Sequence, residues 1–373
     1  MRTRRILQIS AAIAALAGVS AQAREERTFA VSYFYTASYA EDGDCPNGLN
    51  PSTAQVWMSG MRALDLPEEK VEAFFAGSKS MKEEERNQIY MDYIGGRGRI
   101  DGKSVNIYAN PLARPYLTEE PKLFTTVSKF GYGFNLDGKC ASSPTGFEDP
   151  ETHEKGVNNE YYRVMSCVQS FRAKPPFRAS ANAMHSGSSY SWVTARPMMP
   201  AWLFTISGED FSKDGDVTVS FFRSLDRVNI DGKSDPMAHD TFRFDPDLPP
   251  NTFKGKIEGG VVTVQPLANF YMKADQYIYP EVRLRNAHFR VVLKPDGKAD
   301  SVLGGYQPWM DIYGSMALPG AGNETGNALD TATFYVMLKK HAEASPDPKT
   351  GQNTEISAAY RIEAIPAYVV DAE

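Results

Sequence analysis

Apolar and polar residues alternate along much of the chain, and this alternation predicts β-strands. In the segment 28–38, Phe29, Val31, Tyr33 and Tyr35 occupy every second position, which is the period of a strand with one buried face. Similar runs predict further strands over the ranges 201–207, 217–223, 241–244, 253–258, 261–265, 282–293 and 354–370.

Turn signals separate several of these runs. Asp-Gly-Lys occurs at 101–103, 137–139, 231–233 and 296–298, Asp214-Gly215-Asp216 is similar, and Gly-Gly at 259–260 joins two predicted strands. The Asp-Gly and Gly-Gly dipeptides suit the tight turns of antiparallel hairpins. Their unequal separations exclude a propeller or a solenoid repeat. We therefore expect a mainly β fold, an antiparallel β-sandwich or jelly roll with helical insertions.

Helical periodicity marks the insertions. Asn50-Pro51 has the residues that begin a helix, and Trp57, Met61 and Leu64 then share one face. Other helices are predicted from Pro67 to Gly77, from Ser80 to Gly95, over 158–171 and after Asp330.

Two domain organisations fit this order of elements. In the first, a strand-plus-helix half (24–174) precedes a β-sandwich half (175–373), with Pro175-Pro176 at the boundary. In the second, the terminal strands 28–38 and 354–370 pair with each other, which makes 24–373 one continuous domain.

The first 23 residues have the pattern of a signal peptide. Arg2, Arg4 and Arg5 precede an apolar run over 6–20, and Ala21-Gln22-Ala23 matches a small-x-small cleavage site. The apolar run is too short to span a bilayer, and no later segment reaches 18 apolar residues. We expect a periplasmic or secreted, soluble protein, with the Sec and Tat export routes both open.

The charge of the mature chain narrows the choice of partners. Without the three arginines of the leader, the 40 basic residues become 37 against 46 acidic ones, so the net charge changes from −6 to −9. An acidic protein is poorly suited to nucleic acid or to an anionic lipid surface.

Three cysteines, Cys45, Cys140 and Cys167, would be exposed to an oxidising compartment. A Cys140–Cys167 disulfide is favoured because the shorter loop between these two residues closes more readily. Cys45 would then be buried, free or paired with another chain. The spacing of the three cysteines does not exclude a disulfide that includes Cys45.

The best candidate for a metal site is the run Asp210-Phe211-Ser212-Lys213-Asp214-Gly215. It places oxygen side chains at alternate positions before a glycine, as a calcium loop does, and Asp216 could add a further ligand. The acidic residue expected at the twelfth position is absent, because Phe221 stands there. Calcium is therefore one reading of Asp210, Ser212, Asp214 and Asp216, and a solvated turn is the other.

Aromatic residues suggest a ligand-binding face after Gly304-Gly305. Tyr306, Trp309 and Tyr313 could stack on a sugar or a peptide, or they could fill the end of the sandwich. The sequence has no HExxH, CxxCH or GxSxG motif, so enzymatic activity is not expected from any motif.

Three segments resemble secreted, β-rich bacterial proteins that carry no known activity. They are the run from Phe147 to Cys167, the strand from Asp216 to Arg223, and Gly304-Gly305-Tyr306. The resemblance implies export and a β-rich fold.

These features predict an exported binding or envelope-accessory module that recognises a glycan, a peptide or a partner protein. One alternative is an envelope hydrolase that acts on a sugar or ester through carboxylates, with Asp149, Glu154, Glu160 and Asp240 among the candidates. Another is an accessory subunit of a periplasmic redox complex, docked through Cys45 or the acidic surface.

Overall fold

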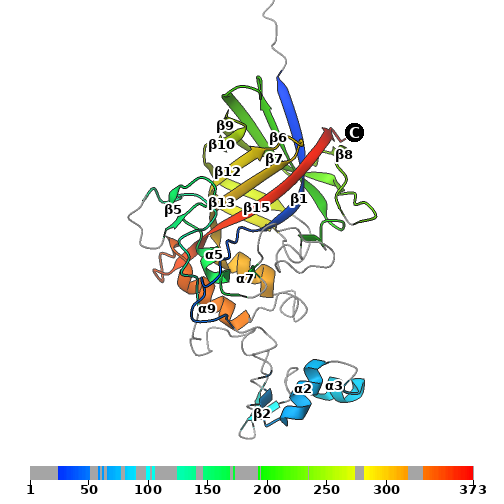
Figure 1. The fold of residues 1–373 in the computed structure, drawn as a ribbon, viewed down its shortest axis with the longest axis vertical. Helices are drawn as coiled ribbons and strands as arrows, with labels where there is room; N and C mark the ends of the chain where they lie inside the picture. The colour runs from blue at the N-terminus through cyan, green and yellow to red at the C-terminus, as the bar shows by residue number, and fades with distance from the viewer. Residues whose placement is uncertain are drawn as a thin grey trace, which may run out of the picture.

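Figure 1 shows the computed structural model of the chain. The structure describes residues 24–50, 58, 61–62, 65–76, 80–89, 98–100, 103–105, 124–139, 146–168, 171–172, 192–193, 195–233, 235–273, 281–317 and 331–372. The predicted signal peptide and the predicted boundary at Pro175-Pro176 lie outside these residues.

Eight of the described strands close into an antiparallel barrel (Figure 1). In their order around the barrel they are β1 (Glu25–Thr36), β6 (Pro200–Gly208), β7 (Gly215–Arg227), β9 (Asn251–Glu258), β10 (Val261–Val264), β12 (Glu281–Leu293), β13 (Ala299–Pro308) and β15 (Asn353–Val370). β1 pairs with β6 on one side and with β15 on the other. The pairing predicted for the two terminal strands is confirmed, and β1 belongs to the same barrel as the strands that follow residue 175.

The prediction of a sandwich or jelly roll is wrong because the β1–β15 pairing joins the two ends of the sheet. From Thr28↔Ala367 to Thr36↔Tyr360, β1 lies antiparallel to the last strand, and only one irregularity interrupts the register. A sandwich and a barrel share the same inward–outward alternation of side chains along each strand. The alternation therefore predicts the strands, but it cannot tell two packed sheets from one closed sheet.

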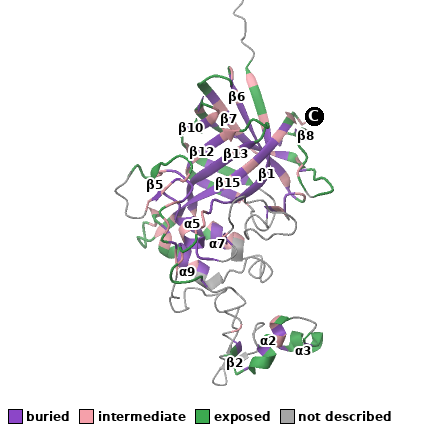
Figure 2. Cartoon of the chain, viewed as in Figure 1, coloured by how far each residue is buried: buried purple, intermediate pink, exposed green. Residues whose placement is uncertain are grey.

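A packed aromatic core fills the barrel. Phe221 lies near the centre of this core, with its ring 5.9 Å from that of Phe204 and 5.8 Å from that of Phe289. Phe253 adds a further ring 6.1 Å from Phe289. Figure 2 shows the barrel strands as largely buried. Side chains thus occupy the interior, as expected for a barrel of eight strands.

β13 is a barrel strand that the hydrophobic pattern did not predict, because its two glycines suggested a loop. A Cβ at Gly304 would lie 3.0 Å from the Phe134 ring, and one at Gly305 would lie 2.9 Å from the Arg285 carbonyl oxygen. These glycines let neighbouring groups approach a strand that pairs with both β12 and β15.

Further strands lie outside the barrel order. β11 (Leu267–Lys273) pairs with β12, and β14 (Ala344–Pro346) and β8 (Asp240–Arg243) pair with β15. Two small hairpins are formed by β2 (Gly98–Ile100) with β3 (Lys103–Val105), and by β4 (Phe147–Glu148) with β5 (Lys155–Val157).

Three helices contact the barrel strands at one end, which we call the helix-capped base. They are α5 (Glu160–Met165), α7 (Trp309–Ala317) and α9 (Thr331–His341) (Figure 1). Asn159 caps α5 by accepting a hydrogen bond from the Tyr162 amide. The Asn159 side-chain amide also donates to the carbonyl oxygens of Ala37 and Tyr132.

The α2 (Glu68–Ala76) and α3 (Glu83–Ile89) helices have a small apolar core of their own. Its buried members are Met61, Leu66, Val71, Phe74, Met81 and Ile89. The helices predicted from Pro67 and Ser80 are confirmed over the ranges of α2 and α3, and the predicted end at Gly95 lies outside the described residues.

Candidate functional site

The three predicted ligand-binding aromatic residues are buried. Tyr306, Trp309 and Tyr313 are each 7–8% exposed. Trp309 and Tyr313 pack edge-on against Tyr335 of α9, with ring centroids 5.1 and 5.2 Å apart, and the Arg285 guanidinium lies 4.9 Å from the Tyr306 ring. The contacts of Trp309 and Tyr313 join α7 to α9, and that of Tyr306 joins β13 to β12. Stacking of a sugar on them stays a prediction.

The predicted calcium loop forms a turn between β6 and β7. Asp210 accepts hydrogen bonds from the backbone amide and the hydroxyl of Ser212 and pairs with Lys213, and these contacts hold the pKa of Asp210 below its usual range. Asp214 instead accepts the Gly259 amide at 2.9 Å. In the part of the chain that the structure describes, no three His, Cys, Asp or Glu side chains gather as a metal site. Calcium stays a prediction, to be tested by thermal scans of wild type and Asp214→Ala with calcium or chelator.

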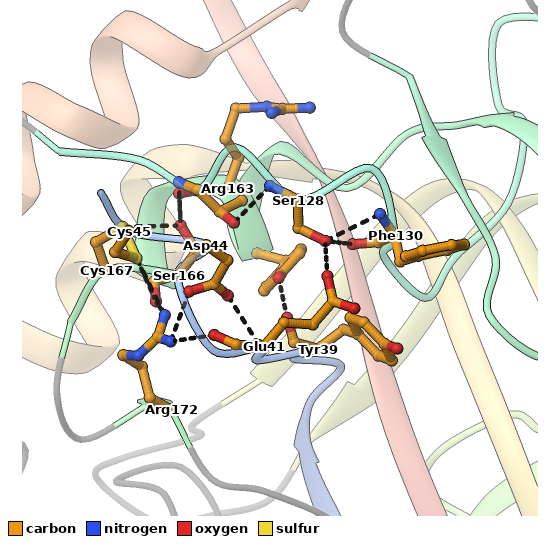
Figure 3. Close-up of polar contacts among 12 residues, drawn as sticks. Tyr39, Glu41, Asp44, Cys45, Ser128, Phe130, Arg163, Ser166, Cys167 and Arg172 are labelled. Carbon is orange, nitrogen blue, oxygen red and sulfur yellow. Dashed lines mark hydrogen bonds and ion pairs between the residues drawn. A yellow bond between two sulfur atoms is a disulfide. The ribbon is translucent and has the colours of Figure 1, made fainter. Parts of the chain in front are cut away.

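Cys167 forms a disulfide with Cys45, so the prediction of a Cys140–Cys167 bridge is wrong. The two Cα atoms are 5.9 Å apart, and 122 residues separate the cysteines in sequence (Figure 3). Cys140 lies outside the described residues. The shorter loop favoured Cys140 on entropy alone, whereas tertiary contacts place Cys45 beside the end of α5.

Arg172 and Asn50 hold the Cys45 loop in place. The Arg172 guanidinium donates to Asp44 at 2.6 Å, to the Glu41 carbonyl oxygen at 3.0 Å and to the Ser166 carbonyl oxygen at 2.8 Å (Figure 3). The Asn50 amide donates to the Cys167 carbonyl oxygen at 2.8 Å. The bridge therefore joins the segment after β1 to the helix-capped base.

The four candidate carboxylates lie in three separate places, with Asp149 and Glu154 both at the β4–β5 hairpin. Asp149 is buried in an ion pair with Arg290 of β12 at 2.9 Å, and Glu154 is exposed in the turn between β4 and β5. Glu160 begins α5 at the base, and Asp240 begins β8. The structure does not bring these four together.

A different surface stands out on the outside of the barrel. We call it the outer flap: residues 228–233 and 235–239, β8, and the end of β15 (366–370). β8 runs parallel to the end of β15, with Tyr368 opposite Thr241 and Val370 opposite Arg243. On its other side, Phe244 bridges to Ser224 of β7. The flap thus covers the outer face of the barrel strands (Figure 1).

The underside of the outer flap is a second apolar core. Phe242 of β8 is 1% exposed and packs with Phe222 and Val228 against the barrel wall. The other buried members are Ala30, Ala201, Leu203, Ile365 and Ala367. This packing fixes the flap on the barrel.

The upper side of the flap and the adjoining end of β7 expose large apolar residues. They are Leu225, Ile230, Met237, Tyr368 and Val370, and Tyr368 is 57% exposed. The His239 ring lies 6.2 Å from that of Tyr368, which joins the loop to the strand. Grooves of about 580 and 400 Å³ lie beside the end of β15, the larger one lined by Phe222, Phe244 and Val370 among others.

Acidic side chains surround this apolar surface. Asp226 pairs with Arg243 at 2.6 Å, and this hydrogen bond lowers the pKa of Asp226. Backbone amides of Asp235 and Lys233 donate to Asp231 and lower its pKa. Within the described residues, Asp231, Asp235 and Asp240 make no ion pair, while Arg227 and Lys233 are exposed on the same stretch of chain, so only a small net negative charge remains on this side of the flap.

Sequence reasoning predicted β8 and the end of β15 but missed the surface they form. The signal was present in the last strand, where Ala367 is buried while Tyr368 and Val370 are exposed. Only the tertiary structure shows that the end of β15 pairs with β8 and lies beside the loop that carries His239.

No protein-family model matches the chain, and no curated protein and no solved structure proved similar to it. Among the described residues, no helix combines the length and the apolarity needed to cross a membrane. The resemblance to secreted β-rich proteins stays a prediction.

Proposed function

We propose that this protein is an exported accessory module that docks onto another protein through the outer flap. The observation that carries the proposal is that Leu225, Ile230, Met237, Tyr368 and Val370 are all exposed, on the flap and on the adjoining end of β7, segments that the β8–β15 pairing and the Ser224–Phe244 bridge join. Soluble monomers rarely expose contiguous apolar surface unless it serves an interaction. Tyrosine and methionine are also enriched where proteins bind each other.

The charge around the flap indicates the chemistry of the partner. Asp231, Asp235 and Asp240 border the apolar residues, and Arg227 and Lys233 lie among them. The complementary surface is therefore an apolar patch whose border places lysine or arginine opposite the three carboxylates and acidic groups opposite the two cations. Such charges steer the two proteins together and determine orientation, while the apolar residues supply most of the affinity.

Two observations support a periplasmic or extracellular location. The leader pattern over residues 1–23 is that of an exported protein. The Cys45–Cys167 bridge is a bond that persists in oxidising compartments.

Site-specific photo-crosslinking in cells of the native host tests the docking. Met237 on the flap and Met310 on α7 are 51% and 50% exposed, so they form a matched pair of positions for a benzophenone amino acid. We expect a covalent adduct with one protein from Met237, and no such adduct from Met310. The adduct should weaken as salt is raised, because the acidic border contributes to encounter.

Reconstitution with the purified, identified partner completes the test. Calorimetry should show that Tyr368→Ala weakens binding at least tenfold, about 1.4 kcal/mol, while Met310→Ala leaves it unchanged. An adduct with a second copy of the chain, equal adducts from both positions, or unchanged affinity for Tyr368→Ala would each contradict the proposal.

A further inference from the structure

Helices α5 and α9 bring a histidine and a carboxylate together at the helix-capped base. The Glu160 Oε2 atom lies 2.7 Å from His341 Nδ1, and Glu160 Oε1 accepts a hydrogen bond from Arg163 Nε at 2.7 Å. The two residues are 181 positions apart in sequence. Burial opposes ionisation of Glu160, but the hydrogen bonds from His341 and Arg163 outweigh it and lower the pKa of this carboxyl.

The contact with Glu160 orients the His341 ring. When Nδ1 carries the hydrogen that is donated to the carboxylate, the neutral ring has its lone pair on Nε2. Within the described residues, Nε2 makes no hydrogen bond, and the His341 side chain is 19% exposed. This is the arrangement of a general base that a carboxylate holds in position.

A second carboxyl group lies close by. Glu343 follows α9, and its amide donates to the Glu355 carbonyl oxygen at 2.9 Å. Ser357 is among the groups that act on the Glu343 carboxyl, and the Ser357 hydroxyl accepts the Glu160 amide at 2.9 Å. Burial of the carboxyl, with the charge of Glu160 as a smaller cause, raises the pKa of Glu343, although the residue keeps an exposed surface. Two neighbouring carboxyl groups with opposite pKa shifts are a feature of acid–base sites.

We infer that His341, Glu160 and Glu343 form a hydrolytic site for carboxylic esters, separate from the outer flap. His341 Nε2 takes a proton from water while the water oxygen bonds to the ester carbonyl carbon and the carbonyl electron pair moves to its oxygen. As that pair returns, the bond to the alcohol oxygen breaks, and this oxygen takes the proton from Glu343. The products are an acid and an alcohol. His341 then loses its proton to solvent, and Glu343 regains one.

Esters fit this cluster better than glycosides. A glycosidase needs two carboxyl groups that both face the sugar. Here Glu160 is 11% exposed and is occupied by His341 and Arg163, so it positions the base and does not act as a nucleophile. Water activated by histidine suits attack on a carbonyl carbon.

Hydrolysis of p-nitrophenyl acetate and p-nitrophenyl butyrate by the full exported chain tests the inference. His153 is the matched control, because it also contacts a carboxylate, Glu148, at 3.3 Å, but at an exposed turn. We expect wild type and His153→Gln to hydrolyse these esters equally, and His341→Gln and Glu343→Gln to be slower by about 100-fold.

Glu343→Gln keeps the Glu160–His341 pair, so its activity remains informative even if His341→Gln destabilises the base. Melting curves of each variant separate loss of fold from loss of activity. No hydrolysis by wild type above the buffer rate, or a wild-type rate in folded Glu343→Gln, would overturn the inference. Crosslinking at Met237 does not depend on this site, so the two proposals can fail separately.

Discussion

The helix-capped base and the outer flap both pack apolar side chains on the barrel, but the base adds buried polar and covalent links that the flap core lacks. Beside the apolar faces of its helices, the base has a disulfide, the Arg172–Asp44 pair and the Glu160–His341 pair, all substantially buried. The flap is held by apolar packing beneath β8 and exposes apolar residues above it.

Because of this difference, we expect the stability of the helix-capped base to respond to pH and reductants, and the outer flap to serve recognition. Buried charges and a disulfide respond to pH and to reductants, whereas an apolar contact responds to neither. We therefore expect the base to depend on its chemical environment, and the flap to depend on the size and shape of its side chains.

Loss of the disulfide should have the largest effect. A bridge between cysteines 122 residues apart constrains the unfolded chain, and loop entropy predicts a loss of about 4–5 kcal/mol for Cys45→Ala with Cys167→Ala. Urea unfolding measures it, with Cys140→Ala as the control that leaves the bridge intact. Equal stability of the double variant and wild type would show that the bridge does not hold the base.

Phe242→Ala should have the next largest effect, because it empties part of the apolar core beneath the flap. Truncation of a buried phenylalanine typically costs about 3–5 kcal/mol, and the edge position of this cluster favours the lower end. Denaturant unfolding gives the loss, which should be the same at pH 7 and at pH 5. A strongly pH-dependent loss would mean that charge, too, holds the flap.

Acid should lower the free energy of unfolding that the helix-capped base contributes, by a smaller amount than the two substitutions above. The folded-state pKa of Glu160 is below its ordinary value of 4.5, so its contribution is complete above that pH and disappears as pH falls through the lowered value. Glu160→Gln should therefore lose less stability between pH 6 and pH 3 than wild type, as measured by urea unfolding at each pH. Asp226→Asn on the flap, whose pKa is also lowered but whose ion pair is more exposed, is the comparison. If Asp226→Asn reduced the acid-induced loss of stability more than Glu160→Gln does, the flap and not the helix-capped base would be the more acid-sensitive region.

Tyr368→Ser should have the smallest effect on folding. An exposed side chain outside the core changes the free energy of unfolding by about 0.5 kcal/mol or less. The same substitution should abolish the crosslinked adduct from Met237. A loss of stability comparable to that of Phe242→Ala would show that Tyr368 serves the fold and not recognition.

Much of the strand order follows from local patterns. The hairpin from Phe253 through Gly259-Gly260 to Val264 lies where the alternation placed it, and the turn at Asp296-Gly297 joins β12 to β13. β13 itself was not predicted, because two successive glycines usually indicate a loop. Here Gly304 and Gly305 lie in a strand, where neighbouring groups come too close for a side chain. The alternation of side chains and the choice of turn residues are local properties. They therefore predict where a strand or turn lies, but not which other strands it will pack against.

Neither the His341–Glu160 pair nor the outer flap could be predicted from these local patterns. His341 was visible as the last residue of a helix and Glu160 as one carboxylate among many, but nothing near either residue indicates the other. The Cys45–Cys167 bridge was predicted wrongly for a related reason, since sequence separation measures the entropy of a loop and not where folding places its ends.

By itself, the sequence determined that this chain would be a β protein with terminal strands able to pair, because side-chain alternation and turn residues act over a few positions. Tertiary structure alone decided that the sheet would close, that Cys45 would meet Cys167, and that Tyr368 would lie beside His239. Each of these depends on contacts between distant segments, which form only when the whole barrel buries its aromatic core.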